Sequence, residues 1–120
     1  MAELNTVAIA LLSSTTGVDM KTPANTTLYT VPPGKVLYLQ AVVVRDPSAS
    51  LAGGTSYSFT NFLQTVDLSS LTTPGTDYVV LGGNNAKYTE TAAGTAIEIT
   101  VTTGSTAACT ATVDVFGYLV

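Results

Sequence analysis

The feature that most constrains the fold is the stretch 27–46, in which two β-rich segments flank Pro32-Pro33-Gly34. The two prolines fix φ and remove two amide donors, so an incoming strand has to stop before them. The glycine that follows gives the backbone freedom to reverse direction. This pattern predicts a hairpin made of a short strand over 27–31, a tight turn and a long strand over 35–46.

The long strand is apolar on both of its faces. Alternation along a strand places one set of side chains on one face, namely Leu37, Leu39, Ala41 and Val43, and a second set on the other, namely Val36, Tyr38, Val42 and Val44. A strand in a half-solvated sheet would alternate apolar with polar residues. We therefore expect a central strand whose second face is covered by another sheet, by the N-terminal arm or by a neighbouring subunit.

Composition places the chain among folded domains with a nearly neutral surface. Hydrophobic residues make up 46% of its 120 residues and charged residues only 10%, against about 25% charged residues in an average protein. A chain of this length buries roughly two-thirds of its unfolded surface in one core. We predict a single domain, with an N-terminal strand and arm over 1–26 and a sandwich body over 27–120.

Short alternating segments recur along the rest of the chain, and no segment has the periodicity of a helix. Further strands are predicted over 5–12, 56–60, 64–68, 77–81 and 87–91, and a polar connection over 13–23. About eight strands with turns near every ten residues predict an all-β fold, an antiparallel β-sandwich of the jelly-roll type.

The last two predicted strands, 96–103 and 109–119, have the clearest alternation. Their inward residues are predicted to be Ile97, Ile99 and Val101 in the first and Cys109, Ala111, Val113, Val115 and Leu119 in the second. Joined by residues 104–108, they are expected to form a hairpin in which Ile99 lies opposite Val113, because a slip by one residue would turn an apolar face outward.

This register places Glu98 directly opposite Asp114 on the outer face. Glycosidases use a pair of carboxyl groups in catalysis, and carboxylate oxygens are also ligands of calcium. A glycosidase needs a cleft and sugar-stacking aromatics, and the chain has no Trp, while calcium needs more oxygen ligands. We favour two solvated acids, neutralised by Lys35, Arg45 or a neighbouring subunit.

The sequence lacks the usual equipment of an enzyme. It has no His, the commonest general base and transition-metal ligand, and no Gly-x-Ser-x-Gly or Ser-x-x-Lys pattern. We predict no catalytic residue, no cofactor and no metal, and we expect the lone Cys109 to be a small core residue. The loop residues Asn84, Asn85 and Tyr88 could contact a carbohydrate, although a turn requiring positive φ explains the same residues.

Charge and hydropathy also limit the partners. The four Lys and Arg residues form no basic cluster, so direct nucleic-acid binding is not expected. The N-terminal stretch carries Glu3 and no positive residue, and its apolar run from Val7 to Leu12 is too short to span a membrane. We expect no signal peptide and no membrane association.

The C-terminal strand has an outward face that begins polar and ends apolar. Thr110, Thr112 and Asp114 are followed on this face by Phe116, Tyr118 and Val120. Either a second layer of the same chain covers this stripe or another subunit does. With the long-strand face of Val36, Tyr38, Val42 and Val44, it forms the candidate interface with another protein subunit, and the doubly apolar strands predict a homotrimer.

Two segments carry a resemblance to a known class of proteins. Thr27-Leu-Tyr-Thr-Val-Pro-Pro-Gly-Lys35 and Ala111-Thr-Val-Asp-Val-Phe-Gly-Tyr-Leu119 resemble segments of small virion proteins of tailed bacteriophages, above all the jelly-roll head decoration (cement) proteins. The resemblance implies a trimer on the capsid exterior, a major capsid protein as partner, synthesis in the host cytoplasm and no catalytic residues. The alternative is a carbohydrate-binding module or a tail-fibre, receptor-binding domain.

Overall fold

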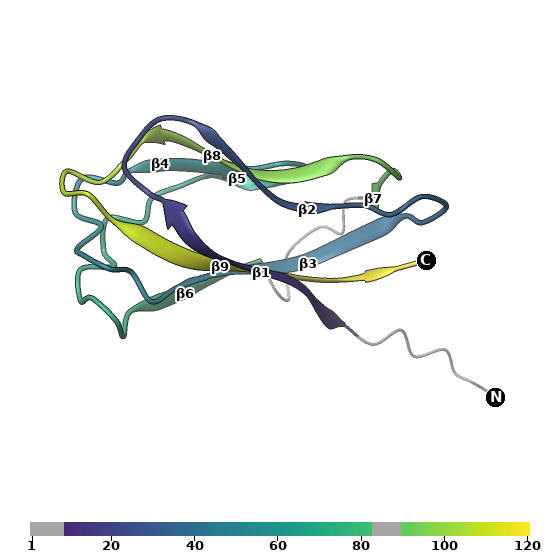
Figure 1. Ribbon diagram of the computed structural model, residues 1–120, viewed down its shortest axis with the longest axis horizontal. Helices are drawn as coiled ribbons and strands as arrows, with labels where there is room; N and C mark the ends of the chain where they lie inside the picture. Colours follow the sequence, from purple (N-terminus) through teal and green to yellow (C-terminus); the bar gives the residue numbers. More distant parts are fainter. Residues whose placement is uncertain (1–8, 83–89) are drawn as a thin grey trace.

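The computed structural model describes residues 9–82 and 90–120, which form two antiparallel sheets packed face to face, with no helix among them (Figure 1). The strands of this described part are β1 (Ala10–Asp19), β2 (Asn25–Thr30), β3 (Leu37–Arg45), β4 (Ser56–Phe59), β5 (Phe62–Val66), β6 (Tyr78–Gly82), β7 (Glu90–Thr91), β8 (Ala96–Thr103) and β9 (Thr110–Leu119).

The strand order is that of a jelly roll. One sheet, here called the β9 sheet, has the order β1-β9-β3-β6, and the short β7 also pairs with β3. The other, the β8 sheet, has the order β2-β8-β4-β5. The antiparallel pairs β1 with β9, β2 with β8, β3 with β6 and β4 with β5 are nested and alternate between the sheets. The predicted β-sandwich is confirmed, and its topology is that of a jelly roll.

The core lies between the sheets and is built from the alternate residues of each strand. Strand β8 contributes Ile97, Ile99 and Val101, and β9 contributes Ala111, Val113 and Val115, all of them buried as predicted. Cys109 is also buried, and Leu119 is half-buried against the same core. The period-two pattern therefore identified the inward faces of both strands correctly.

The predicted hairpin between these two strands is wrong. β8 lies between β2 and β4, whereas β9 lies between β1 and β3 in the other sheet. Ile99 is opposite Thr26 and Phe59, and Val113 is opposite Thr15 and Val44. The connection between β8 and β9 crosses from one sheet to the other, which in a jelly roll replaces hairpin pairing of the last two strands.

The predicted hairpin over 27–46 is also a crossing between sheets. The turn is present as expected, because the Lys35 N–H donates to the Pro32 carbonyl at 3.2 Å and Gly34 has φ 74°. However, β2 before the turn belongs to the β8 sheet and β3 after it belongs to the β9 sheet. The prolines end the strand, and the turn carries the chain to the opposite layer.

Strand β3 is central, as predicted, but its two faces exchange along its length. The register with β9 shifts between Leu39 and Ala41, which is a bulge at Gln40. As a result the inward residues are Leu37, Leu39, Val42 and Val44, and the outward ones are Tyr38, Ala41, Val43 and Arg45. The assignment of Val42 and Val44 to an interface is therefore wrong, because both are fully buried in the core.

The described N-terminal residues belong to the sandwich as the strand β1. Strand β1 runs through the segment 13–19, where a polar connection was expected, and pairs with β9. It is long and polar because it forms a sheet edge, with register shifts after Leu11 and after Thr15. Residues 5–8 of the predicted first strand lie outside the described residues, as do 87–89 of the strand now represented by β7.

The exchange of faces along β3 can be tested with two adjacent valines. Val42→Thr places a hydroxyl in the core without a partner and should lower the free energy of unfolding by about 1–3 kcal/mol. Val43→Thr, on the outer face, should change it by less than about 0.5 kcal/mol. Denaturant unfolding of both variants measures this, and equal costs at the two positions would contradict the bulge.

Tyr57 is a buried core residue whose ionisation makes the stability of the fold depend on pH. Its side chain is fully buried and its hydroxyl donates to the Met20 carbonyl oxygen at 2.7 Å. Burial raises the pKa of Tyr57 to about 12, above the value near 10 expected in the unfolded chain. The fold thus holds the phenol in its neutral form, and ionisation of this group opposes folding.

The sign of this effect predicts alkaline destabilisation. The Tyr57 contribution should be fully present below pH about 10 and be lost as pH rises toward 12, a total of about 3 kcal/mol. Tyr57→Phe should be less stable near neutral pH, because it loses a hydrogen bond, but should lack this part of the alkaline fall. Unfolding measured across this range tests the difference, and parallel curves for the two proteins would refute it.

Candidate docking face

The outward side of the β9 sheet, here called the outer face, consists of side chains of β1, β9, β3, β6 and β7 that point away from the core. Register places them in four rows across the sheet: Tyr118, Tyr38 and Glu90; Leu11, Phe116, Ala41 and Gly82; Ser14, Asp114, Val43 and Val80; and Thr112, Arg45 and Tyr78. Figure 1 shows this face turned away from the β8 sheet.

Large apolar side chains on this face are open to solvent. Leu11 is 53% exposed, Val80 is 54% exposed and Tyr78 is 66% exposed. Between them, Phe116, Ala41 and Val43 are half-buried by their neighbours within the sheet. Within residues 9–82 and 90–120, no third layer is present over this sheet.

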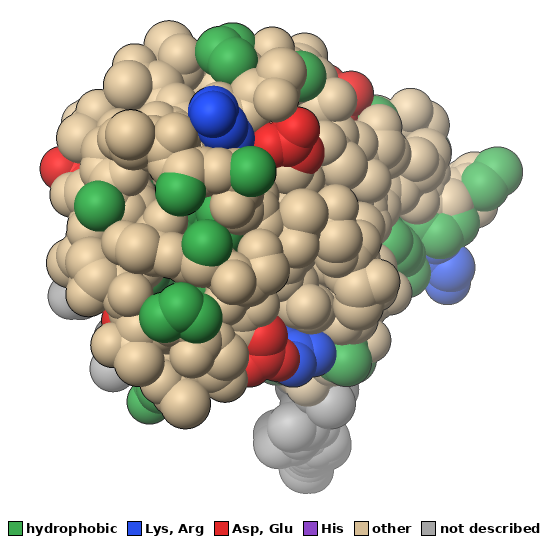
Figure 2. Space-filling model, turned by 60° about the vertical axis from the view of Figure 1, so that its left-hand side comes forward, with side chains coloured by type: hydrophobic (Ala, Val, Ile, Leu, Met, Phe, Trp, Pro, Cys, Tyr) green, Lys and Arg blue, Asp and Glu red, His purple; other side chains and the backbone are tan. Residues whose placement is uncertain are grey.

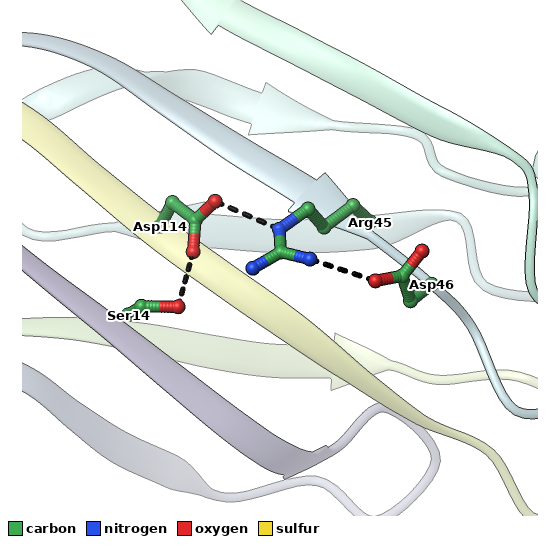
Figure 3. Close-up of polar contacts among 4 residues, drawn as sticks. All are labelled: Ser14, Arg45, Asp46 and Asp114. Carbon is green, nitrogen blue, oxygen red and sulfur yellow. Dashed lines mark hydrogen bonds and ion pairs between the residues drawn. The ribbon is translucent and has the colours of Figure 1, made fainter. Parts of the chain in front are cut away.

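A polar cluster of four residues, Ser14, Arg45, Asp46 and Asp114, lies on the outer face around the end of β3 (Figure 3). The Asp114 carboxylate, 10% exposed, accepts hydrogen bonds from Ser14 Oγ at 2.6 Å and from Arg45 Nε at 2.8 Å. Arg45 Nη1 donates in turn to Asp46 Oδ2 at 2.7 Å. Both Asp114 oxygens therefore have partners, which a partly buried carboxylate requires.

The local backbone explains how these groups meet. Arg45 ends β3 beside Thr112 of β9, and Asp46 follows with φ 52°, a left-handed conformation that Asp tolerates better than most residues. Hydrogen bonding to Asp114 and its negative charge raise the pKa of Arg45 above its ordinary value. Arg45 stays charged and forms hydrogen bonds with the carboxylates of Asp114 and Asp46.

Two tyrosines stack at the end of the same face. The rings of Tyr38 and Tyr118 have centroids 5.1 Å apart and planes 9° from parallel. The Tyr38 hydroxyl donates to Glu90 Oε2 at 2.8 Å, and this hydrogen bond raises the pKa of Tyr38. The stack is a rigid, neutral aromatic surface next to the apolar row of Leu11 and Phe116.

The structure places several of the predicted interface residues on this face. Phe116, Tyr118 and Tyr38 lie on it and are half-buried. Val120 is 62% exposed, and its backbone N–H and carbonyl pair with those of Val36 at the end of the sheet. The predicted loop contacts Asn84, Asn85 and Tyr88 lie outside the described residues.

Glu98 and Asp114 do not form a pair. Glu98 is on the outward side of the β8 sheet, where its carboxylate accepts a hydrogen bond from Thr27 Oγ1 at 3.3 Å, and Asp114 is on the outward side of the β9 sheet. The opposed carboxylates proposed from the sequence, with their glycosidase and calcium readings, are therefore wrong. Arg45, one of the two cations named as neutralising partners, does neutralise Asp114.

The remaining chemistry of the described residues is sparse. They contain no group of three or more His, Cys, Asp or Glu side chains that could hold a metal ion. None of their segments is a helix long and apolar enough to cross a membrane. Figure 2 shows one end of the molecule, where charged side chains appear singly or in pairs of opposite sign on a mostly uncharged surface.

Sequence reasoning named Arg45 as a possible partner of Asp114 but missed Ser14, because 13–23 was predicted to be a polar connection and not a strand beside β9. Comparisons with protein-family models, curated proteins and solved structures find no match to this chain.

The pairing of Arg45 with Asp114 can be measured by a double-mutant cycle. Arg45→Met keeps the aliphatic stem but leaves a nearly buried carboxylate with only Ser14, so it should lower the melting temperature. Asp114→Leu in the Arg45→Met background should recover part of that loss, because it removes the unpaired charge. Strictly additive effects of the two changes would show that the residues do not interact.

Proposed function

We propose that this chain is a structural, non-enzymatic subunit of a bacteriophage head, which binds the capsid exterior as a trimer and stabilises it. The observation that carries the proposal is the outer face of the β9 sheet, where exposed apolar side chains extend from Leu11 on β1 to Val80 on β6. Contiguous apolar surface of this kind on a small domain marks a protein contact.

The arrangement of charge on the outer face supports the same role. Asp114 and Arg45 neutralise each other, and Asp46 and Ser14 complete their hydrogen bonds. A partner that covers this face would not strip water from an unpaired charge, which is the main cost of burying polar groups at an interface. The stacked Tyr38 and Tyr118 add an aromatic anchor of the type that dominates interface energies.

Fold and local sequence support a virion as the setting. The jelly roll is an architecture of viral capsid proteins, although lectin domains use it too. Two segments resemble phage decoration proteins. Residues 27–35 include the turn that connects the two sheets, and residues 111–119 lie in β9, a strand of the outer face. A trimer would let each subunit cover part of another's outer face while leaving the rest for the major capsid protein.

The proposal predicts that substitutions on the outer face of β9 weaken assembly, whereas substitutions on its core side lower the stability of the fold. Phe116→Ala combined with Tyr118→Ala should reduce the trimer in native mass spectrometry and reduce co-sedimentation with capsids that lack the protein. Leu119→Ala, on the core side, should leave assembly intact and cost about 1–2 kcal/mol, below the 2–5 kcal/mol of a fully buried leucine.

Two outcomes would count against the proposal. A wild-type protein that remains monomeric at micromolar concentration and does not bind capsids would overturn it. If the double variant unfolds while its surviving fraction stays fully assembled, the aromatic pair belongs to the fold of the monomer and the contact lies elsewhere. Saturable binding to a glycan would instead favour the carbohydrate-binding alternative.

A further inference from the structure

Among the residues that the structure describes, strand β6 is an edge strand without the usual protection of edges. The edge strands of the described sheets are β1, β6, β2, β5 and the two-residue β7, which pairs with β3 beyond the end of β6. The pairings of β1, β2 and β5 with their neighbours all contain a register shift. Of the four edge strands longer than two residues, only β6 pairs residue for residue with its neighbour β3, without a shift, from Tyr78 to Gly82.

The side chains of β6 do not protect it either. Its sequence Tyr78-Val-Val-Leu-Gly82 contains no charged residue and no proline. Tyr78 and Val80 are exposed on the outer face, and Val79 and Leu81 are only half-buried against the core. Soluble proteins normally blunt such edges with lysine, proline or bulges, because a flat apolar edge is a template for another strand.

We propose that β6 pairs antiparallel with β6 of a second copy of this chain, about a two-fold axis at Val80, which joins two β9 sheets into one continuous sheet. A two-fold axis perpendicular to the sheet places Val80 opposite Val80 of the other copy, Val79 opposite Leu81 and Tyr78 opposite Gly82. This register uses every residue of the strand and keeps outward residues opposite outward ones.

The strand is complementary to itself in this register. Gly82 has φ 95°, and a Cβ there would meet the ring of the core residue Phe62 and the Gln40 carbonyl. Gly82 is exposed and carries no side chain, so the Tyr78 ring of the other copy can cover it, as aromatic residues do for glycines across strands. Val79 and Leu81 would extend the core-side apolar row from one copy into the next.

Electrostatics favour a second copy as the occupant. A two-fold axis sets every charge near it against its own image, and the chain carries a net charge of −4. Strand β6 has no charge, and the nearest acid in sequence, Asp77, accepts a hydrogen bond from the Thr73 N–H at 2.8 Å within the preceding turn. The contact thus brings together an uncharged surface of an otherwise acidic protein.

This contact is independent of the proposed function. It uses the hydrogen-bonding edge of the β9 sheet rather than its outer face, and two-fold rather than three-fold symmetry. In a trimer, the β6 edges would remain free to link one trimer to the next.

Cysteine cross-linking tests the register directly. Val80→Cys should give a covalent dimer with a short thiol cross-linker, because residues paired across antiparallel strands have Cβ atoms about 4.5–5.5 Å apart. The matched control is Leu11→Cys, which has nearly the same exposure but lies on the opposite edge of the sheet. The native Cys109 is buried and serves as the background.

We expect Val80→Cys to cross-link at least about tenfold faster than Leu11→Cys at micromolar protein, because pairing raises the local thiol concentration. Val80→Lys should remove the two-fold species from native mass spectra while keeping the wild-type unfolding curve. Equal cross-linking of both cysteines, or an unchanged mass distribution with Val80→Lys, would overturn the inference. Failure of the wild-type protein to bind capsids, with intact Val80→Cys cross-linking, would instead overturn only the proposed function.

Discussion

A two-layer sandwich can cover only one face of each sheet, and this chain supplies apolar side chains for more than that. The inward residues of β3 and β9 fill the core together with those of β8. The same two strands also carry Tyr38, Ala41, Val43, Phe116 and Tyr118 outward. The fold satisfies the first set and leaves the second on the surface, and the account of function depends on this imbalance.

Polar and apolar groups on the outer face have different tasks. The bonds from Asp114 to Ser14 and Arg45 join β1, β9 and β3, so they fix the register of the three strands beneath the apolar surface. Desolvation offsets much of the attraction between the two charges of such a partly buried pair. The apolar rows around it are the surface proposed for contact, and within the described residues the short regular β6 ends the sheet.

The sequence predicted which side of each strand faces the core better than it predicted which strands pair. Alternation in β8 and β9 identified their inward residues, since burial follows period two whichever strand lies alongside. It could not tell that the connection after Gly104 crosses to the other sheet, because the choice between a hairpin and a crossing is made by long-range packing. Bulges are equally invisible to periodicity, so the shift at Gln40 moved Val42 and Val44 from the expected interface into the core.

The candidate site was predictable to the extent that it follows from single strands. Phe116 and Tyr118 were found because a polar face that turns apolar is unusual within one strand. Their neighbours Leu11, Ser14 and Val80 come from two other strands, β1 and β6, and only the jelly-roll order places these beside β9 and β3. The expected pair of Glu98 with Asp114 failed for the same reason, since it depended on a wrong strand partner.

Residue-level footprinting by hydroxyl radicals is the most direct measurement of the central claim, that assembly covers the outer face of the β9 sheet. It should compare dilute protein with assembled protein, using Tyr29 of β2 in the β8 sheet as the internal reference. The account predicts that Tyr78, Phe116 and Tyr118 become protected on assembly while Tyr29 keeps its reactivity. Protection of Tyr29 with unchanged reactivity at Tyr78, Phe116 and Tyr118 would contradict it.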